Sequence, residues 1–416
     1  MFGGLNKSTS IFALAAVAGL AMGGVSAKAA DLGGDCCADL EERVAELEAT
    51  TARKGNRKVS LTIYGQVTTA VMFWDADGNG VDENNTYVVD PQTSGTRFGF
   101  KGSAKIDADW SAGYNIELQW QAADATRVRV DSDEGEDLPE FRQAHWWVKS
   151  KTFGKIRVGQ ADTANSGIAE ISVANELIAD GMSSSQAGGA IISSDLSGPS
   201  MGNFEFNRLN VVRYDTPELA GFIVSAAWGE DDVWDVALRY AGEFAGFKIA
   251  GGIAYGESTD ARNGAADLDT SGNLIDDSQV EVVNGGLSVM HVATGLFVTA
   301  SAGYRDRDSY VDDQDEFWHL TGGIEQKWSS LGKTTIFGMG GEYNEKSRFV
   351  RVTDGVASTV VDGDQVQYYG GGIVQKIDAA AMDLFISYRH YDVDNGSNPT
   401  EDIDFDVVVG GGRIKF

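Results

Sequence analysis

The chain is poor in proline and in basic residues, and each shortage removes a class of protein. Only 5 of its 416 residues are proline, and no Pro-rich run or Gly/Ser spacer interrupts the body of the chain, which disfavours a string of domains joined by linkers. The 33 lysines and arginines are outnumbered by 62 aspartates and glutamates, so the formal net charge is -29. So acidic a surface repels phosphate backbones, and no nucleic acid is expected as a partner.

Histidine and phosphate-binding motifs for catalysis are missing as well. The four histidines form no H-x-x-x-H pair, and the chain contains no Walker-type phosphate loop. The two cysteines, Cys36 and Cys37, are adjacent, so a disulfide between them would be strained, and pairing between chains stays open. We therefore expect no enzyme activity and no cofactor.

One stretch resembles half of a calcium-binding loop. Asp75-x-Asp77-x-Asn79-Gly80 has the spacing of its first half, but the twelfth position is Thr86 instead of the bidentate glutamate. Asp75, Asp77 and Asn79 are therefore weak calcium candidates, and an acidic turn is the simpler interpretation.

The chain is instead rich in glycine, with 52 residues, and in alternating apolar and polar side chains. From Lys58 onward, Val67 and Val71 alternate with polar residues such as Gln66, and this period of two recurs to the C-terminus. The connections between these stretches are of two kinds. Short connections fall near 107–109, 150–153, 217–221, 244–246, 292–295, 329–332 and 378–380. Long connections fall near 75–95, 123–141, 161–209, 229–235, 257–279, 306–316, 345–363 and 392–402.

Seven short and eight long connections, taken alternately, define sixteen strands with both ends on the short-turn side. Trp and Tyr gather at the strand ends, where the two interfacial girdles of a membrane barrel lie. A soluble sandwich would also alternate, but with its polar face outside. We predict an all-β fold, a 16-stranded antiparallel transmembrane β-barrel over residues 58–416.

The last predicted strand changes its pattern along its length. Ile403, Phe405 and Val407 share one parity, whereas Ile414 and Phe416 share the other. A bulge at the three glycines 410–412 would reconcile the two halves.

The N-terminus carries an export signal. Lys7 precedes the short apolar run 11–22, and Ala27-Lys28-Ala29 is an A-x-A cleavage site, so residues 1–29 are read as a signal peptide. Residues 30–57 form a periplasmic segment with a short helix that begins with a capping box at Asp39 and has a coiled-coil-like seam. A solvated spacer is the alternative for this segment.

Several segments of the chain resemble those of a known family. The segments ADLEERVAELEATTARKGNRKVSLTIYGQVTT, TRFGFKG, RQAHWWV, FGKIRVGQ, NVVRYDTPELAGF and GGGRIKF, in this order, are similar to those of alphaproteobacterial porins of the rhizobial type. The resemblance implies a homotrimer of 16-stranded general diffusion channels in the outer membrane of Gram-negative bacteria. It also implies that the terminal Phe416 is the signal for the barrel-assembly machinery, and that lipid and lipopolysaccharide surround the barrel.

The longest connection, 161–209, follows the fifth strand, and in porins this third loop folds inward and narrows the lumen. We expect acids on this loop to face bases on the wall, and such a transverse field hinders apolar solutes. The candidate lining residues are the wall bases Arg97, Lys101, Arg142, Lys155, Arg157, Arg213 and Arg239 and the acids Asp162, Glu170, Glu176 and Asp180.

Each of these residues has a plainer alternative, a structural ion pair. Inward placement of the bases is favoured because an arginine facing lipid at mid-membrane costs about 2–4 kcal/mol. The parity of Arg142 with Ala144 and Trp146 leaves its direction open. The net charge favours cations, although the charge of the outer loops and that of the constriction need not agree.

The leading hypothesis is a passive channel for small hydrophilic solutes and ions. A substrate-specific outer-membrane channel is the first alternative. The second is an additional structural role, in which the N-terminus ties the outer membrane to peptidoglycan.

The predicted processing and the predicted anchoring can be tested together. We expect the mature chain to begin at Ala30, and anchoring would leave this residue linked to a cell-wall fragment. Peptidoglycan digestion followed by mass spectrometry of the N-terminal peptide reads both. A free Ala30 amine throughout would contradict anchoring, and a different first residue would contradict the cleavage site.

Overall fold

The structure is a computed structural model, and it describes most of the chain after residue 57. The described ranges are 58–121, 123–132, 136–180, 187–199, 201–259, 279–308, 313–353, 356–394 and 403–416. The predicted signal peptide (1–29) and the segment 30–57 with its helix lie outside the described residues.

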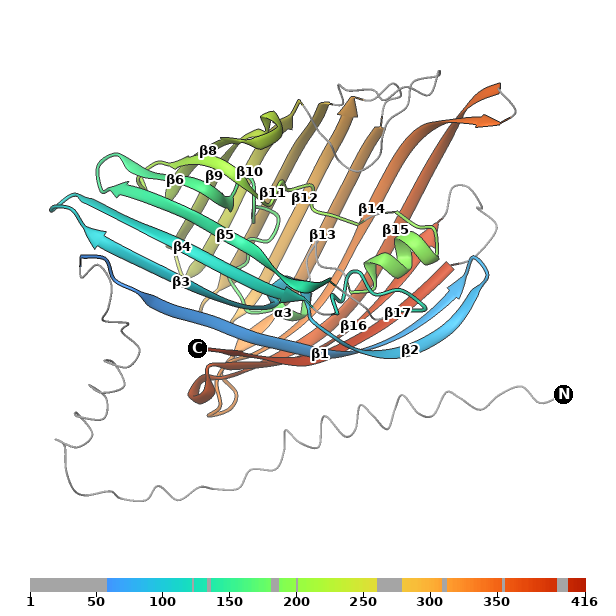
Figure 1. The fold of residues 1–416 in the computed structure, drawn as a ribbon. Helices are drawn as coiled ribbons and strands as arrows, with labels where there is room; N and C mark the ends of the chain where they lie inside the picture. The colour runs from blue at the N-terminus through green and yellow to red at the C-terminus, as the bar shows by residue number, and fades with distance from the viewer. Residues whose placement is uncertain are drawn as a thin grey trace. The chain divides into compact units, whose positions relative to one another are not determined.

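In these ranges one antiparallel sheet of seventeen strands closes on itself through β1 and β17 (Figure 1). The strands are β1 (Thr62–Gly78), β2 (Val81–Val89), β3 (Thr96–Lys105), β4 (Trp110–Gln121), β5 (Glu136–Ser150), β6 (Gly154–Asp162), β7 (Arg208–Asp215), β8 (Phe222–Gly229), β9 (Trp234–Phe244), β10 (Phe247–Ser258), β11 (Gln279–His291), β12 (Leu296–Asp308), β13 (Asp313–Gln326), β14 (Thr334–Thr353), β15 (Val356–Ile377), β16 (Met382–Asp394) and β17 (Ile403–Lys415).

Helical turns are few and short in the described ranges. They are α3 (Leu177–Asp180), η1 (Gln92–Ser94), η2 (Ile191–Asp195), η3 (Glu230–Asp232) and η4 (Asp378–Ala380). None of the helices in the part of the chain that is described has the length and apolar character needed to cross a membrane.

The predicted sixteen-stranded barrel is confirmed, because two of the seventeen strands share one place in the wall. β1 pairs with β2 from Ala70 to Gly78 and with β3 from Thr62 to Gln66. β2 and β3 are thus one wall strand, which Pro91 and η1 interrupt. Proline lacks the N–H that a ladder needs, so the pairing is interrupted there.

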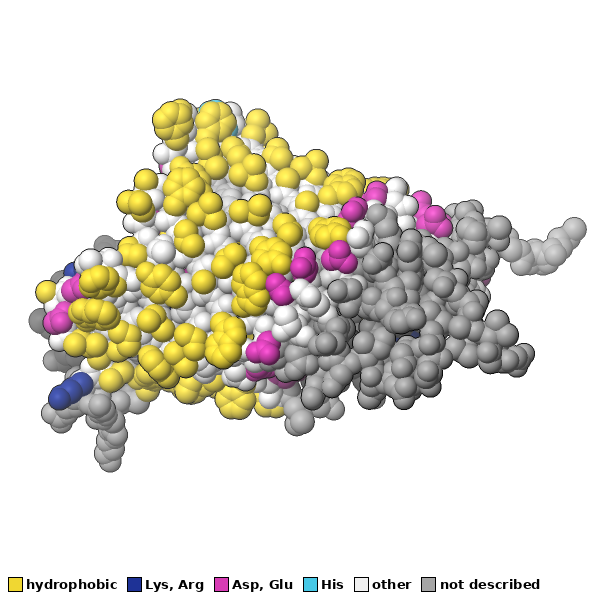
Figure 2. Space-filling view, turned by 90° about the horizontal axis from the view of Figure 1, so that it is seen from above, with side chains coloured by type: hydrophobic (Ala, Val, Ile, Leu, Met, Phe, Trp, Pro, Cys, Tyr) yellow, Lys and Arg dark blue, Asp and Glu magenta, His cyan; other side chains and the backbone are white. Residues whose placement is uncertain are grey.

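The outer wall is apolar. On β1, the side chains of Val67, Val71 and Phe73 are exposed, whereas those of Gln66 and Thr68, on either side of Val67, are buried on the inner side. Figure 2 shows one outer face, where hydrophobic side chains form a broad field bordered by acidic ones. A monomeric soluble protein does not expose so much contiguous apolar surface, so this face is built for lipid, and a soluble sandwich is excluded.

Two predicted long loops are wrong. The segment 75–95 is mostly a hairpin, in which β1 turns into β2 at Asn79–Gly80, and the segment 345–363 is largely occupied by the paired ends of β14 and β15. Both hairpins rise from the barrel beyond its apolar belt. On the β1–β2 hairpin the outer face carries polar residues such as Asp75, Asp77 and Asn84, so it lacks the apolar outer face that marks a strand in lipid.

The predicted bulge in β17 is also wrong. β17 pairs in continuous register with β1 and β16 through all three glycines. The inner residues Ile403, Phe405 and Val407 are buried, and Ile414 is exposed on the outer face. The apolar face changes sides because the loop end of β17 packs against material inside the barrel, whereas its other end faces lipid.

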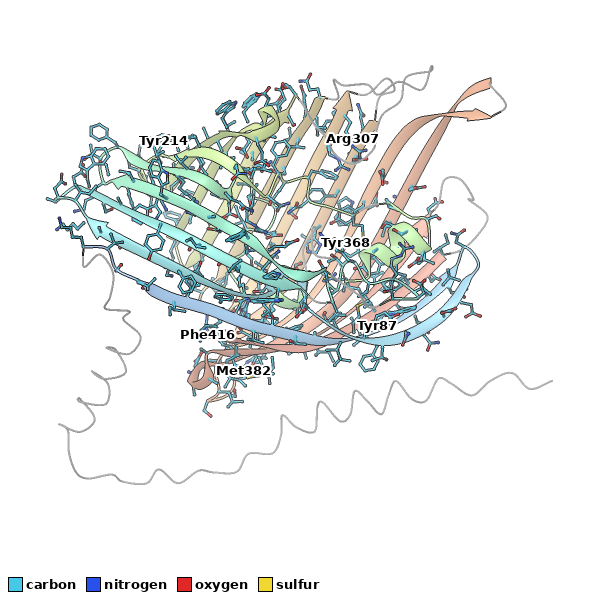
Figure 3. The ribbon with its side chains drawn as sticks, in the orientation of Figure 1. Tyr87, Tyr214, Arg307, Tyr368, Met382 and Phe416 are labelled. Carbon is cyan, nitrogen blue, oxygen red and sulfur yellow. The ribbon has the colours of Figure 1, made fainter. Side chains whose placement is uncertain are left out.

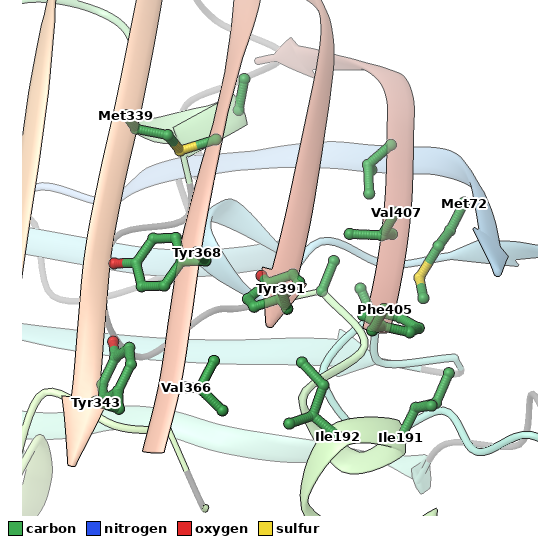
Figure 4. Packing of buried hydrophobic residues seen from close by; sticks show 14 of the residues in the cluster. Met72, Ile191, Ile192, Met339, Tyr343, Val366, Tyr368, Tyr391, Phe405 and Val407 are labelled. Carbon is green, nitrogen blue, oxygen red and sulfur yellow. The ribbon is translucent and has the colours of Figure 1, made fainter. Parts of the chain in front are cut away.

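That material is the long connection between β6 and β7, which folds into the lumen as predicted. Ile191, Ile192 and Leu196 of this third loop are fully buried against inward-facing residues of β1 and β14–β17 (Figure 4). The opposing wall contributes, among others, Met72, Tyr343, Tyr368, Tyr391 and Phe405. The interior of the barrel is therefore a packed core on one side.

The assignment of the outer face can be tested with a matched pair of leucines. Leu320 on β13 and Leu331 in the turn after it are each 48% exposed. We expect Leu320→Arg to lower the free energy of unfolding in lipid vesicles by about 2–4 kcal/mol, because it places a charge in hydrocarbon. Leu331→Arg should change it by less than about 1 kcal/mol. Equal effects in a denaturant titration would contradict a lipid-facing Leu320.

Candidate functional site

Two inward-facing arginines bind the first residues of the third loop, 162–169, which we call its root. Arg213 on β7 donates to the carbonyl oxygens of Asp162 and Thr163 at 3.1 and 2.5 Å. Arg239 on β9 donates to those of Ala164 and Ser166 at 2.6 and 2.8 Å. Both were expected to line the constriction, and the geometry instead gives them a structural contact with the loop backbone.

Two carboxylates hold the same root through its N–H groups. Asp235 accepts hydrogen bonds from the backbone of Ala164 and Asn165 at 3.0 and 2.7 Å. Glu205 accepts from the backbone of Gly167 and Ala169 at 2.5 and 2.9 Å. Burial, followed by the nearby charge of Glu170, raises the pKa of Glu205 to about 8.

The far part of the loop is pinned to the opposite wall by Glu176 and Asp180. Glu176 accepts a hydrogen bond from Ser172 and one from Thr299 of β12 at 3.3 Å. Asp180 accepts from Thr321 of β13 at 2.6 Å and lies 3.2 Å from Nε2 of His319. Both carboxylates are fully buried, so they lie beneath the loop and not in the open channel.

The third loop is also bound to the connection between β4 and β5 and to the β1–β2 turn. Arg129, in the connection between β4 and β5, donates to both carboxylate oxygens of Asp195, and the backbone N–H of Val130 donates to the same group. Asn79, at the β1–β2 turn, donates to Ser197 at 3.0 Å. The loop is thus fixed along most of its described length.

The wall from β3 to β7 stays open to water. The side chains of Arg142, Arg157 and Arg208 are 20%, 18% and 23% exposed, and that of Arg97 is also partly exposed. The inner side chains of β12–β16 beneath the loop are almost fully buried. The passage left beside the third loop therefore runs along the basic wall.

The direction of Arg142 is resolved by a bulge. Opposite β5, Glu117 pairs with Gln143 and Leu118 pairs with Phe141, so Arg142 is the extra residue. Phe141 and Trp146 point outward and are exposed, and Arg142 turns inward to contact Glu117 at 2.9 Å and Gln119 at 2.9 Å. A bulge next to a functional wall re-aims one side chain in this way.

Carboxylates on this wall are in contact with arginines. Asp215 accepts from Arg157 at 2.6 Å and from Arg213 at 2.9 Å. Asp162, the acid expected on the loop, ends β6 and lies 3.7 Å from Arg208.

Lys101 and Lys155 lie over the rings of Tyr64 and Trp147, at 4.7 and 4.9 Å from the ring centroids. An aromatic ring holds a cation in place without cancelling its charge. Both lysines therefore remain charges of the open wall.

Several functional residues were missed from the sequence. Arg208 was missed because its position was assigned to the loop, and Arg413, which donates to Asp383 at 2.7 Å, because β17 was expected to bulge. His319 was considered only for metal motifs. Its alternation with the outward residues Trp318 and Leu320 could have placed it inside.

The calcium candidates do not form the expected loop. Asp75 and Asp77 lie in the paired part of β1 with their side chains exposed on the outer face, and only Asn79 is in the turn. No group of three or more acidic, histidine or cysteine side chains within the described ranges could hold a metal ion.

The closed barrel, its apolar exterior and its inward-folded loop define a transmembrane channel. Comparison supports this, because residues 10–396 match the profile of a family described as Gram-negative porin. The chain belongs to the Gram-negative porin family. It is an outer-membrane protein whose barrel forms a diffusion channel, and the family and fold are those of a channel and not of an enzyme.

Solved structures share this fold at low sequence identity. The anion-selective porin from Comamonas acidovorans has a TM-score of 0.58 at 14% identity, over 86% of this chain and 100% of that one. The in-vitro folded outer membrane protein OmpT of Vibrio cholerae, in its trimer form, has a TM-score of 0.52 at 14% identity, over 86% and 99%. The outer membrane channel DcaP of Acinetobacter baumannii has 0.51 at 13%, over 88% and 100%. No curated protein sequence matched the chain.

The buried loop acid makes a prediction about pH. Burial raises the pKa of Glu176 to about 7, above its unfolded value, so folding disfavours the ionised form and stability falls as the pH rises toward 7. Glu176→Gln keeps the acceptor for Ser172 and Thr299 but cannot ionise. In detergent we expect wild type and variant to have the same free energy of unfolding at pH 5. At pH 8 we expect that of the variant to be higher by about 1–3 kcal/mol.

Glu218→Gln, in the exposed turn before β8, is the control and should show the same difference from wild type at both pH values. A pH-independent effect of Glu176→Gln would contradict the buried, neutral carboxyl.

Proposed function

We propose that this porin is a general diffusion channel, selecting solutes by size and charge and not by specific binding. The observation that carries the proposal is the third loop, which is fixed to β7 and β9 at its root and to β12 and β13 at its far side. A loop held at both ends narrows the lumen to a constant width. The water-exposed wall beside it carries charge and small polar side chains.

A channel specific for sugars is the weaker candidate. Sugar-binding sites use aromatic faces that solute can reach. The inward rings of Tyr343, Tyr368 and Tyr391 do form a row with centroid distances of 6.0 and 5.6 Å. The row is buried beneath the third loop, as the position of Tyr368 inside the barrel also indicates (Figure 3), so solute in the passage does not touch it.

The finer assignments rest on sequence resemblance and on the fold. The trimeric state is supported by the resemblance to trimeric porins and by the trimer form of OmpT, which has the same fold. The rhizobial type rests on the motifs quoted above. The lining roles of Arg97, Lys101, Arg142, Lys155 and Arg157 are supported by their place on the water-exposed wall.

The role of Phe416 in assembly is supported by its position. Its backbone pairs with that of Gly65 at 3.1 and 3.0 Å, and it lies beside Met382 at the short-turn end (Figure 3). The exposed ring, with β17 closing the barrel, is accessible to an assembly factor. Lipid and lipopolysaccharide are partners of the apolar wall, whereas the peptidoglycan link concerns the N-terminal segment alone.

Single-channel recording in a planar bilayer tests the proposal. We expect the detergent-purified protein to insert in conductance steps that close in three equal sublevels and that stay ohmic when sugars are added. Single sublevels would contradict the trimer. Saturable block by a neutral sugar, or silent insertion, would contradict the general channel.

A further inference from the structure

The passage and the net charge of the chain have opposite signs. The formal charge is -29, yet the charged side chains that water reaches on the wall from β3 to β7 are mainly arginine and lysine. Because ions respond to the charge nearest to their path, the charge on the distant loops has little weight at a constriction, being screened over about 8–10 Å. What matters is the balance along the wall.

That balance is positive at the narrow part. Asp215 is shared by Arg157 and Arg213, so one negative charge faces two positive ones. Glu117 is bound by Arg142 and lies within electrostatic range of Arg97, which repeats the ratio. Arg97 and Arg142 are both also in electrostatic range of Arg208, whose partner is Asp162 at 3.7 Å, so these three arginines face the two carboxylates Glu117 and Asp162.

The wall toward the short-turn end repeats this excess. Asp383 is bound by Arg413 at 2.7 Å and has Lys415 at 3.9 Å. Lys101 and Lys155 lie on aromatic rings and add further positive charge.

At the long-loop end the charges are closer to even. There Arg305 and Arg307 face Asp315 and Glu345, and Glu140 accepts a hydrogen bond from Gln119. The positive excess therefore belongs to the narrow and short-turn parts of the lumen.

Four acids of the third loop do not offset this excess, and Glu170, which is partly exposed, is the loop acid that remains to set against it. Glu176 and Asp180 are buried on the far side of the loop, against β12 and β13. Asp195 is bound by Arg129, and Glu205 holds backbone N–H groups at the loop root. Burial raises the pKa of Glu176 to about 7 and that of Glu205 to about 8, which lowers the negative charge of both carboxyls in neutral water.

We infer that the channel prefers anions, and that small carboxylates and phosphates are its favoured solutes. The residues that set this preference are Arg97, Arg142 and Arg208, together with Lys101 and Lys155 nearer the short-turn end. Arginine suits this task because its guanidinium stays charged and offers donors that match carboxylate and phosphate oxygens. The inference rests on the proposed diffusion channel and adds its solute class.

The test is the reversal potential of the inserted full-length protein in a KCl gradient. We expect the reversal potential to have the sign of the chloride equilibrium potential. A reversal potential with the sign of the potassium equilibrium potential, at normal conductance, overturns the anion preference and leaves the channel intact. Absence of conductance would overturn the proposed function instead, so the two failures are distinguishable.

Variants then assign the preference to the wall. Arg97→Gln and Lys101→Gln should each shift the reversal potential toward potassium, and the double variant should shift it further. Lys327→Gln removes the same charge from an exposed turn and is the control, for which no shift is expected. Equal shifts in Lys101→Gln and Lys327→Gln would overturn the assignment to the wall.

Arg142→Gln is a separate measurement, because it also leaves Glu117 without its arginine. Full-size conductance shows that this variant folds, and its reversal potential should then move further than that of Lys101→Gln. A second readout uses sodium phosphate as the probe. In liposome uptake, phosphate should enter wild-type vesicles faster than an ammonium solute of equal size, and Arg97→Gln should narrow the difference. Faster entry of the ammonium solute into wild type would overturn the inference.

Discussion

Backbone N–H and C=O groups in the hydrocarbon of a membrane find no water, so each of them has to pair within the protein. The pairing of β1 with β17 meets this condition, since it leaves the sheet without an edge. Closure also divides the side chains into two sets, because alternate residues of each strand point outward to lipid or inward to the lumen. The outer set is constrained to be apolar. The inner set is free, and the individual properties of this chain are found there.

The inner face is used in two ways. From β12 through β17 to β1 it is buried and carries many aromatic and aliphatic side chains beside polar ones, and the third loop packs on it through residues such as Ile191 and Ile192. From β3 to β7 it is charged and open to water. The division explains why the loop can cross the lumen without closing it: hydrophobic burial holds it to one side, and the backbone contacts of Arg213 and Arg239 hold its root.

Much of the fold follows from local patterns, whereas the site depends on contacts between distant residues. The period of two and the seven short turns predicted the strands of the lipid belt correctly, because hydrocarbon imposes that pattern on each strand separately. The β1–β2 and β14–β15 hairpins extend beyond the belt, where nothing imposes it. Arg142 faces inward only because Phe141 and Gln143 pair with two consecutive residues of β4, which leaves Arg142 as the extra residue of a bulge. Glu176 was predicted as an acid of the channel, but its partner Thr299 lies 123 residues away, and no local pattern encodes that contact.

The same distinction governs charge. An acidic composition indicates what the whole surface repels, but a channel is controlled by the few groups beside its narrowest path. In this chain acids of the third loop fix the loop in place: Asp195 binds Arg129, and Glu205 binds backbone N–H groups. Each carboxylate used in this way is withdrawn from the passage, so the arginines opposite are left in excess. Fixing the loop and setting the sign of the channel are therefore two results of one arrangement of side chains.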